Sequence, residues 1–138
     1  MGLGPDANNK IYTPTQVKGL LVGQKVVHGA IGSYHALVVT SEGQMYAWGE
    51  NFNKQLGDGT LNSRLVPVPV DMTLAPLNET FIVQVAAGSS HSYALGSNGK
   101  VYQWGGNEAP KEVGGALVGK FVTQIHARST FAVALTNE

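Results

Sequence analysis

The sequence predicts an all-β fold built from repeated units of four short antiparallel strands. A constant spacing of 56 residues separates two copies of the pattern Tyr-x-Trp-Gly-x-Asn, at 46–51 and 102–107. Glycine supplies 18 of the 138 residues, about twice its average share, as a chain with many tight turns requires. Short apolar runs alternate with turn residues, and helical periodicity is weak. Four-stranded units repeated at this length are typical of β-propeller blades.

The first unit, residues 25–81, contains four candidate strands. These are the apolar runs Val26–Ala30, Tyr34–Thr40, Met45–Gly49 and Val66–Val70. A Ser-Glu-Gly turn precedes the third strand, and a polar loop at 50–64 precedes the fourth. Pro67 and Pro69 lack the N–H that a strand ladder needs, so the fourth strand is expected at the edge of its sheet.

Further segments repeat parts of this unit. The second unit, residues 82–120, has Asn98-Gly99 at its central hairpin, as type I′ turns prefer, and a shortened loop that reads EAPKEVGG. Residues 121–138 repeat the first half of a unit, and residues 1–24 repeat the tail and outer strand of a preceding one. Because an unclosed set of blades exposes two sheet faces, we expect either a segment of a longer polypeptide or a sector completed by other chains.

Glycine, histidine and tryptophan recur at equivalent positions of the two units. Trp48 and Trp104 lie on the third strands, where side-chain alternation is expected to point them between neighbouring blades. His35 and His91 are expected to form hydrogen bonds between strands or to neighbouring backbone, because no Cys or acidic cluster completes a metal site. The structural repeat positions are Gly32, His35, Trp48, Gly49, Gly88, His91, Trp104 and Gly105.

These repeated residues resemble the repeat of the regulator of chromosome condensation family. The matching positions of the first unit are Ala30, Gly32, His35, Gly43, Tyr46, Trp48, Gly49, Asn51, Gln55, Leu56 and Gly57. The second unit matches through Asn107 and then lacks the Gln-Leu-Gly loop. The resemblance implies a seven-bladed propeller, of which this chain supplies an incomplete sector.

The resemblance also implies a protein-interaction module that acts as a scaffold or regulatory domain, without catalytic residues. The alternative that it leaves open is a guanine-nucleotide exchange factor for a Ran-like small GTPase, since fold alone does not choose between them. Expected partners are proteins, namely a small GTPase or other subunits of a large complex. Remaining propeller blades, in the same chain or in other copies, are the other expected partners.

A binding surface is expected on one rim of the propeller, where turns between the first and second strands open beside loops between the third and fourth. Loops on a rigid framework are the usual place of binding residues. Phe52 is either a contact anchor or tucked beneath its own loop. The candidate partner-binding residues are Tyr34, Glu50, Phe52, Asn53, Lys54, Asp58, Ser90, Glu108, Lys111 and Arg128.

Composition argues against several other functions. The 9 basic residues equal the 9 acidic ones and are scattered, so nucleic-acid binding through charge is not expected. The chain has no Cys and no Gly-x-Ser-x-Gly or phosphate-loop motif, so we predict no catalytic site, cofactor or metal. No apolar run approaches the roughly 20 residues of a membrane helix, and no secretory signal is evident. We therefore expect no membrane association and an intracellular location, cytoplasmic or nuclear.

Overall fold

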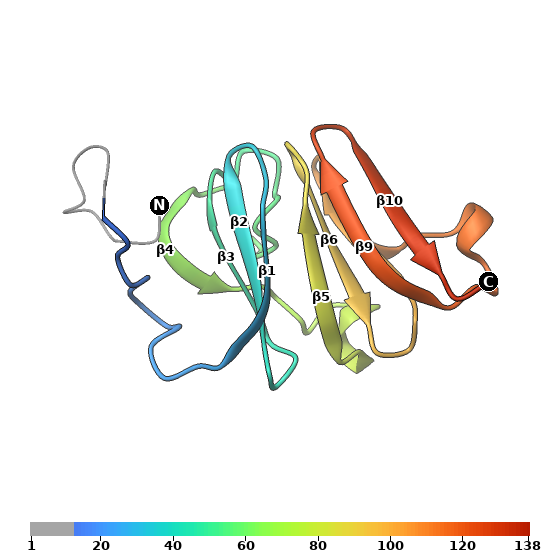
Figure 1. Ribbon diagram of the computed structural model, residues 1–138. Coiled ribbons are helices and arrows are strands. Elements are labelled where there is room, and N and C mark those ends of the chain that lie inside the picture. Colours follow the sequence, from blue (N-terminus) through green and yellow to red (C-terminus); the bar gives the residue numbers. More distant parts are fainter. Residues whose placement is uncertain (1–12) are drawn as a thin grey trace.

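The computed structural model describes residues 13–138, which form three antiparallel sheets standing side by side in chain order (Figure 1). The first sheet contains β1 (Val26–Ile31), β2 (His35–Thr40), β3 (Met45–Gly49) and β4 (Arg64–Pro69). The second contains β5 (Ile82–Ala87), β6 (His91–Gly96), β7 (Val101–Gly105) and β8 (Glu108–Glu112). The third contains β9 (Val122–Arg128) and β10 (Phe131–Thr136). This arrangement confirms the predicted all-β class with four-stranded antiparallel sheets.

Strand bounds differ little from the sequence expectation. β4 begins at Arg64 because that residue pairs with Gly49, so the strand starts earlier than the apolar run near Val66–Val70. Its two prolines are tolerated because β4 is the outermost strand of its sheet. Two short 3-10 helices, η1 (Leu77–Glu79) and η2 (Gly115–Leu117), lie in the connections before β5 and β9. Part of the predicted tail of a preceding repeat falls on residues 1–12 and lies outside the described residues.

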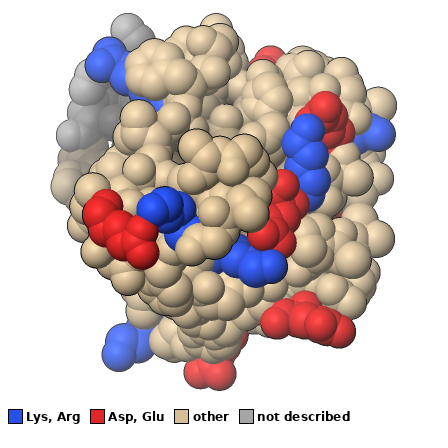
Figure 2. Space-filling model, turned by 90° about the vertical axis from the view of Figure 1, so that its right-hand side faces the viewer, with Lys and Arg blue, Asp and Glu red and all other residues tan. Residues whose placement is uncertain are grey.

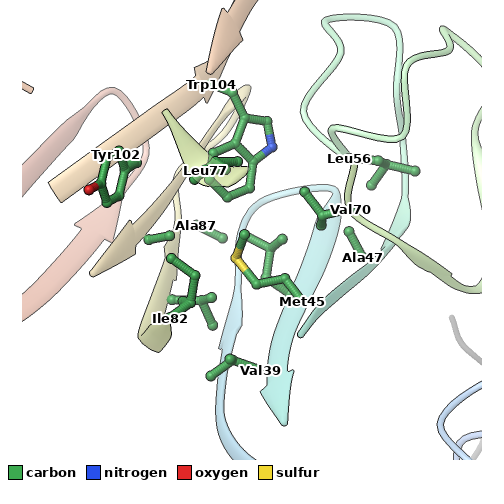
Figure 3. Packing of buried hydrophobic residues seen from close by; sticks show 13 residues of the cluster. Val39, Met45, Ala47, Leu56, Val70, Leu77, Ile82, Ala87, Tyr102 and Trp104 are labelled. Atoms are coloured by element: carbon green, nitrogen blue, oxygen red, sulfur yellow. The ribbon is translucent and has the colours of Figure 1, made fainter. Parts of the chain in front are cut away.

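The main hydrophobic core fills the space between the first and second sheets. Strand alternation turns Leu37, Val39, Met45 and Ala47 of the first sheet towards the second, which contributes Trp104 among others. Figure 3 shows Val39, Met45 and Ala47 of the first sheet meeting Ile82, Ala87 and Trp104 of the second, and Leu77 of η1 belongs to the same cluster. The buried apolar area between the sheets is the principal term that stabilises their association.

A second, smaller core lies between the second and third sheets. Its buried members are Ala86, Leu95, Val101, Val122 and Ile125. Ala86, Leu95 and Val101 lie on the opposite face of the second sheet from Trp104, and Val122 and Ile125 of the third sheet pack against them, so the second sheet is covered on both sides. Covering both faces of each twisted sheet by its neighbours is the packing principle that the repeated sequence predicts.

The repeated glycines at 32 and 88 allow neighbouring sheets to approach at one end. A Cβ on Gly32 would collide with the carbonyl oxygen of Gly88, and a Cβ on Gly88 would lie 2.6 Å from the carbonyl oxygen of Ser129. The adjacent amides use this closeness, since Ser33 N donates to Gly88 O at 3.1 Å and Ser89 N donates to Ser129 O at 2.8 Å. The glycines are therefore required by close backbone approach between sheets.

The two complete sheets differ in the connection between their third and fourth strands. In the first sheet, β3 and β4 are joined by the long loop at 50–63. In the second, β7 and β8 are joined by Gly106 and Asn107 alone, with φ of 59° and 68°. Two residues with positive φ form a type I′ hairpin turn, so the second sheet has no counterpart of the long loop.

Candidate functional site

One end of the three sheets forms a continuous surface of turns and loops, which we call the rim. It comprises residues 32–34, 50–60, 88–90, 105–108 and 128–130, at the upper end of the sheets in Figure 1. Backbone hydrogen bonds join its parts: Glu50 N donates to Tyr34 O at 2.8 Å, and Asn107 N donates to Asn53 O at 3.0 Å. The rim therefore extends across more than one sheet as a connected framework.

Asn51 organises the long rim loop from inside. Its side chain is fully buried, and its Nδ2 donates to Asp58 Oδ1 at 2.9 Å, to Thr60 O at 3.0 Å and to Asn62 O at 3.2 Å. Its Oδ1 accepts a hydrogen bond from Leu56 N at 3.0 Å. These bonds satisfy the backbone and side-chain groups of a loop that has no strand ladder, and they tie its two ends together.

Asp58 belongs to the same internal network. Its carboxylate is 7% exposed and forms an ion pair with Arg64 at 2.9 Å. Burial alone would raise the pKa of Asp58, but hydrogen bonds from Thr60 and Arg64 and the Arg64 charge hold it below its usual value. Although the sequence places Asp58 among the candidate partner contacts, the structure directs its carboxylate into the loop.

Two aromatic side chains stand outward from this rigid framework. Tyr34 is 61% exposed in the β1–β2 turn, and Phe52 is 68% exposed in the long loop. The alternative in which Phe52 tucks beneath its own loop is therefore wrong. Glu50 lies between them in the chain and binds Tyr34 through its backbone, so both rings belong to one part of the rim.

The remaining candidates of the first sheet lie around these rings. Glu50 is half-buried, and its Oε2 accepts a hydrogen bond from Gln55 Nε2 at 3.5 Å. The backbone N–H of Asn53 donates to Gln55 Oε1 at 2.9 Å. Lys54 is exposed and has a φ of 59°, a left-handed conformation that the surrounding loop imposes. Gln55, which the sequence placed only in the repeat pattern, thus supports two candidate contacts from beneath.

Three candidates of the second and third sheets, Ser90, Glu108 and Arg128, continue the rim beyond these rings. Ser90 is half-buried, with Oγ 3.3 Å from His91 Nδ1. Glu108 and Lys111 form an exposed ion pair at 2.5 Å on β8, and Arg128 is exposed at the end of β9. The structure therefore brings the first-sheet candidates together, and Glu108 lies beside them because it lines the same pocket as Lys54.

A buried hydrogen-bond chain crosses from the first sheet to the second beneath the rim. Ser92 Oγ donates to Gln55 O at 2.6 Å, and Trp104 Nε1 donates to the same carbonyl at 3.1 Å. Because the Ser92 hydrogen is used in this bond, its oxygen accepts from His35 Nε2, 2.8 Å away. His35 is therefore structural and neutral, and burial lowers its pKa to about 4.

Sequence reasoning did not identify Ser92 and Gln55 as the partners in this chain. Ser92 is not repeated, since the first copy has Ala36 and the third has Ala132 at that position. His91, the counterpart of His35, is half-buried and contacts Ser90 instead. A repeated histidine thus has different partners in successive sheets, because Ala132, which has no hydroxyl, stands where His91 would need the counterpart of Ser92.

The described residues contain neither a candidate metal site nor a candidate membrane span. No group of three or more His, Asp or Glu side chains is close enough to hold an ion within 13–138. The helices of this same range are too short to cross a bilayer.

Segments of the chain match a known repeat. The Regulator of chromosome condensation (RCC1) repeat matches residues 42–95, and a second form of this repeat matches residues 26–55 and 82–109. The matched segments include both Tyr-x-Trp-Gly-x-Asn copies, on β3 and β7. They also include the long rim loop and both exposed rim aromatics.

Two curated proteins illustrate the similarity. The chain is 42% identical over 92 residues to the human E3 ubiquitin-protein ligase HERC2, covering 67% of this chain and 2% of HERC2. It is 36% identical over 104 residues to the RCC1 domain-containing protein RUG3, mitochondrial, of Arabidopsis thaliana, covering 75% of this chain and 22% of that protein. The chain thus spans a small part of the relatives that it matches.

A solved structure shows the same fold. Prp20p from Saccharomyces cerevisiae, described together with its binding to Gsp1p and histones, superposes with a TM-score of 0.71 at 20% identity. The match covers 86% of this chain and 32% of that one. The shared fold is a β-propeller, and this chain corresponds to part of one.

Proposed function

The chain belongs to the regulator of chromosome condensation repeat family, and from that premise we propose that it is a protein-interaction module that binds its partner through the rim. The observation that supports this proposal is the pair of exposed aromatic side chains, Tyr34 and Phe52, on a loop framework held by buried hydrogen bonds. Exposed aromatic residues on a preorganised surface are typical binding hot spots, because little conformational entropy is lost when they bind.

The polar neighbours of these rings suit a protein partner. Lys54 and Glu50 flank Phe52 with opposite charges, and the formal net charge of the whole chain is zero. A balanced rim of this kind gives specificity by local charge pairing, whereas a nucleic acid requires clustered cations. We therefore place the aromatic pair at the centre of the interface and the charges at its margin.

Truncating either ring is expected to weaken partner binding. The test uses a partner protein that binds to the immobilised wild-type chain. We expect Tyr34→Ala and Phe52→Ala each to lower the affinity of the chain for this partner by about tenfold or more, as loss of a hot-spot side chain does. Titration calorimetry with the purified partner measures the change. Phe81→Ala is the matched control, because Phe81 is also an exposed aromatic residue, at 51%, but immediately precedes β5 at the end of the sheets opposite the rim. Equal affinity of all three variants and the wild type would contradict the proposal.

Nucleotide exchange on a Ran-like small GTPase is the second candidate, and the likeness of fold to Prp20p is the observation in its favour. We expect the chain to leave the release rate of a fluorescent GDP analogue from purified Ran unchanged, since it spans 32% of that related structure. Stopped-flow fluorescence measures the rate. Acceleration by the wild type that is lost in Tyr34→Ala and Phe52→Ala would instead assign exchange activity to the rim.

The relatives' other properties are not transferred to this chain. HERC2 is named as a ligase, but the chain spans 2% of it, so we propose a binding role without a catalytic step. We propose an intracellular location, and because RUG3 is named as mitochondrial, we do not restrict that location to the nucleus or cytoplasm.

A further inference from the structure

A mainly apolar cavity of about 160 Å³ opens beside the rim, between the long loop of the first sheet and the start of β8. Leu74 and Pro110 form part of its walls, and the fully buried Trp104 indole lies at its base. An apolar cavity of about 150 Å³ is large enough to bind benzene, so this one has room for a single phenyl ring. Because Leu74 is 46% exposed, an entering ring would cover apolar surface that now contacts water.

The cavity results from a difference between the two repeats. β8 begins at Glu108, directly after the two-residue turn, and Asn107 N donates to Asn53 O, which ties this turn to the long loop. In the first sheet, the residues that correspond to 108–110 are 52–54, and they belong to the loop rather than to a strand. The wall at 108–110 therefore depends on the short turn of the second unit, and all residues that line the cavity lie between 54 and 110.

Lys54 supplies an unpaired positive charge at the edge of this cavity. Its side chain lines the cavity and is exposed, and it takes part in none of the four ion pairs within residues 13–138. Glu108, on the β8 side, is already paired with Lys111, whose hydrogen bond and charge hold the pKa of Glu108 below its usual value. Among the described residues that line the cavity, Lys54 thus bears the charge without a partner, and this charge complements a carboxylate.

The backbone at Lys54 indicates that its side chain is used. Its φ is 59°, in the left-handed region that disfavours residues with a Cβ, whereas the other positive-φ positions of the loop, Gly57 and Gly59, are glycine. Strained positions of this kind cluster at functional sites, and glycine at 54 would avoid the strain. Two backbone hydrogen bonds hold the residue in place: Lys54 N donates to Asn51 O at 3.0 Å, and Gly57 N donates to Lys54 O at 3.1 Å.

Charges elsewhere on the chain are balanced, which argues against a long acidic segment as the ligand. The face shown in Figure 2, at the third-sheet end of the molecule, has acidic and basic groups next to each other and no large area of one sign. The formal net charge of the whole chain is zero. Recognition at the cavity is therefore expected to depend on one local ion pair rather than on a long-range field.

We propose that this cavity receives a phenylalanine-sized aromatic side chain from an extended segment of the partner protein, and that an acidic residue two positions away in that segment pairs with Lys54. Alternate residues of an extended segment point to the same side, so the ring and the carboxylate reach the cavity and Lys54 together. The proposal rests on the proposed function, because it names the chemistry of the partner segment that binds beside Phe52 on the rim.

The probe is the synthetic peptide GSFSDGS, acetylated and amidated at its ends and added to the isotopically labelled full chain. We expect saturable NMR shift changes at the backbone amides of Gly57, Gly59 and Ala109, which line the cavity. Replacing the phenylalanine of the peptide with alanine should weaken binding at least tenfold, because the apolar contact is lost. Replacing its aspartate with asparagine should weaken binding about threefold, as expected for an exposed ion pair. Neither change alters the protein, so a failure to fold cannot produce the result.

Variants of the chain test the location. Ala109→Phe fills the cavity from the exposed β8 wall and should weaken peptide binding at least tenfold, whereas Ala116→Phe on η2, which does not line the cavity, should not. Lys54→Gly removes the charge and relieves the positive φ, so it should weaken peptide binding about threefold without lowering the urea midpoint of unfolding. With the asparagine peptide, Lys54→Gly should cause no further loss, because the ion pair is already absent.

Absence of saturable shifts at the cavity, equal binding of the alanine peptide, or full peptide binding by a folded Ala109→Phe chain would overturn the proposal. The purified partner protein separates this proposal from that for the rim. Weaker partner binding by Tyr34→Ala and Phe52→Ala, but not by Ala109→Phe or Lys54→Gly, would retain the proposed function and reject the cavity. Weaker partner binding by Ala109→Phe and Lys54→Gly alone would retain the cavity and reject the aromatic pair.

Discussion

Replacing Trp104 with alanine is expected to lower the free energy of unfolding by about 3–5 kcal/mol, the range typical of buried Trp or Phe truncations. The indole is fully buried between the first and second sheets. Its removal leaves a cavity that Leu56 and Val70 cannot fill without moving the long loop. It also removes one of the two donors to the Gln55 carbonyl. Urea unfolding followed by circular dichroism measures the loss.

The other repeated tryptophan provides the matched control. Trp48 occupies the same repeat position on β3 and is also buried, at 8% exposed, but its side chain lies on the face opposite the main core and borders an open cavity of about 650 Å³. We therefore expect Trp48→Ala to cost clearly less than Trp104→Ala. If Trp104→Ala does not fold, Trp104→Phe keeps most of the apolar contact and should cost about 1 kcal/mol for the lost hydrogen bond. An equal or larger cost at Trp48 would contradict this interpretation of the two faces.

The repeat made much of the fold predictable. Equivalent residues in successive units identify strands, turns and the shared face of Trp48 and Trp104, because each unit packs against its neighbours in the same way. The repeat also accounts for Gly32, because its counterpart Gly88 likewise lies so close to the backbone of the next sheet that a Cβ would not fit. Repetition therefore gives information about interactions that every unit makes.

Residues that are not repeated were less predictable. Ser92 becomes the partner of His35 only because the loop around Gln55 closes over the second sheet, which is a contact between distant segments. The exposure of Phe52 depends on the hydrogen bonds of Asn51, and no local pattern in the loop specifies whether its ring points inward or outward.

Acid is expected to destabilise the folded chain through His35 before its carboxylates are protonated. Burial lowers the pKa of His35 from 6.5 to about 4, so the unfolded state binds more protons than the folded state between these values. The free energy of unfolding is therefore fully retained above pH 6.5 and falls as pH decreases to about 4. At 1.36 kcal/mol for each pKa unit, the loss over this window is about 3 kcal/mol.

The structural cause of this pH dependence is the buried chain beneath the rim. His35 Nε2 already donates to Ser92, and Nδ1 is buried with no partner among residues 13–138, so a second ring proton would have no acceptor. His35→Gln should remove the decline between pH 6.5 and 4 even if it lowers stability at pH 7. His91→Gln, at the equivalent and half-buried position, should retain it. Urea titrations at pH 7, 5.5 and 4.5 measure the slopes, and an undiminished slope in His35→Gln would assign the acid sensitivity to other groups.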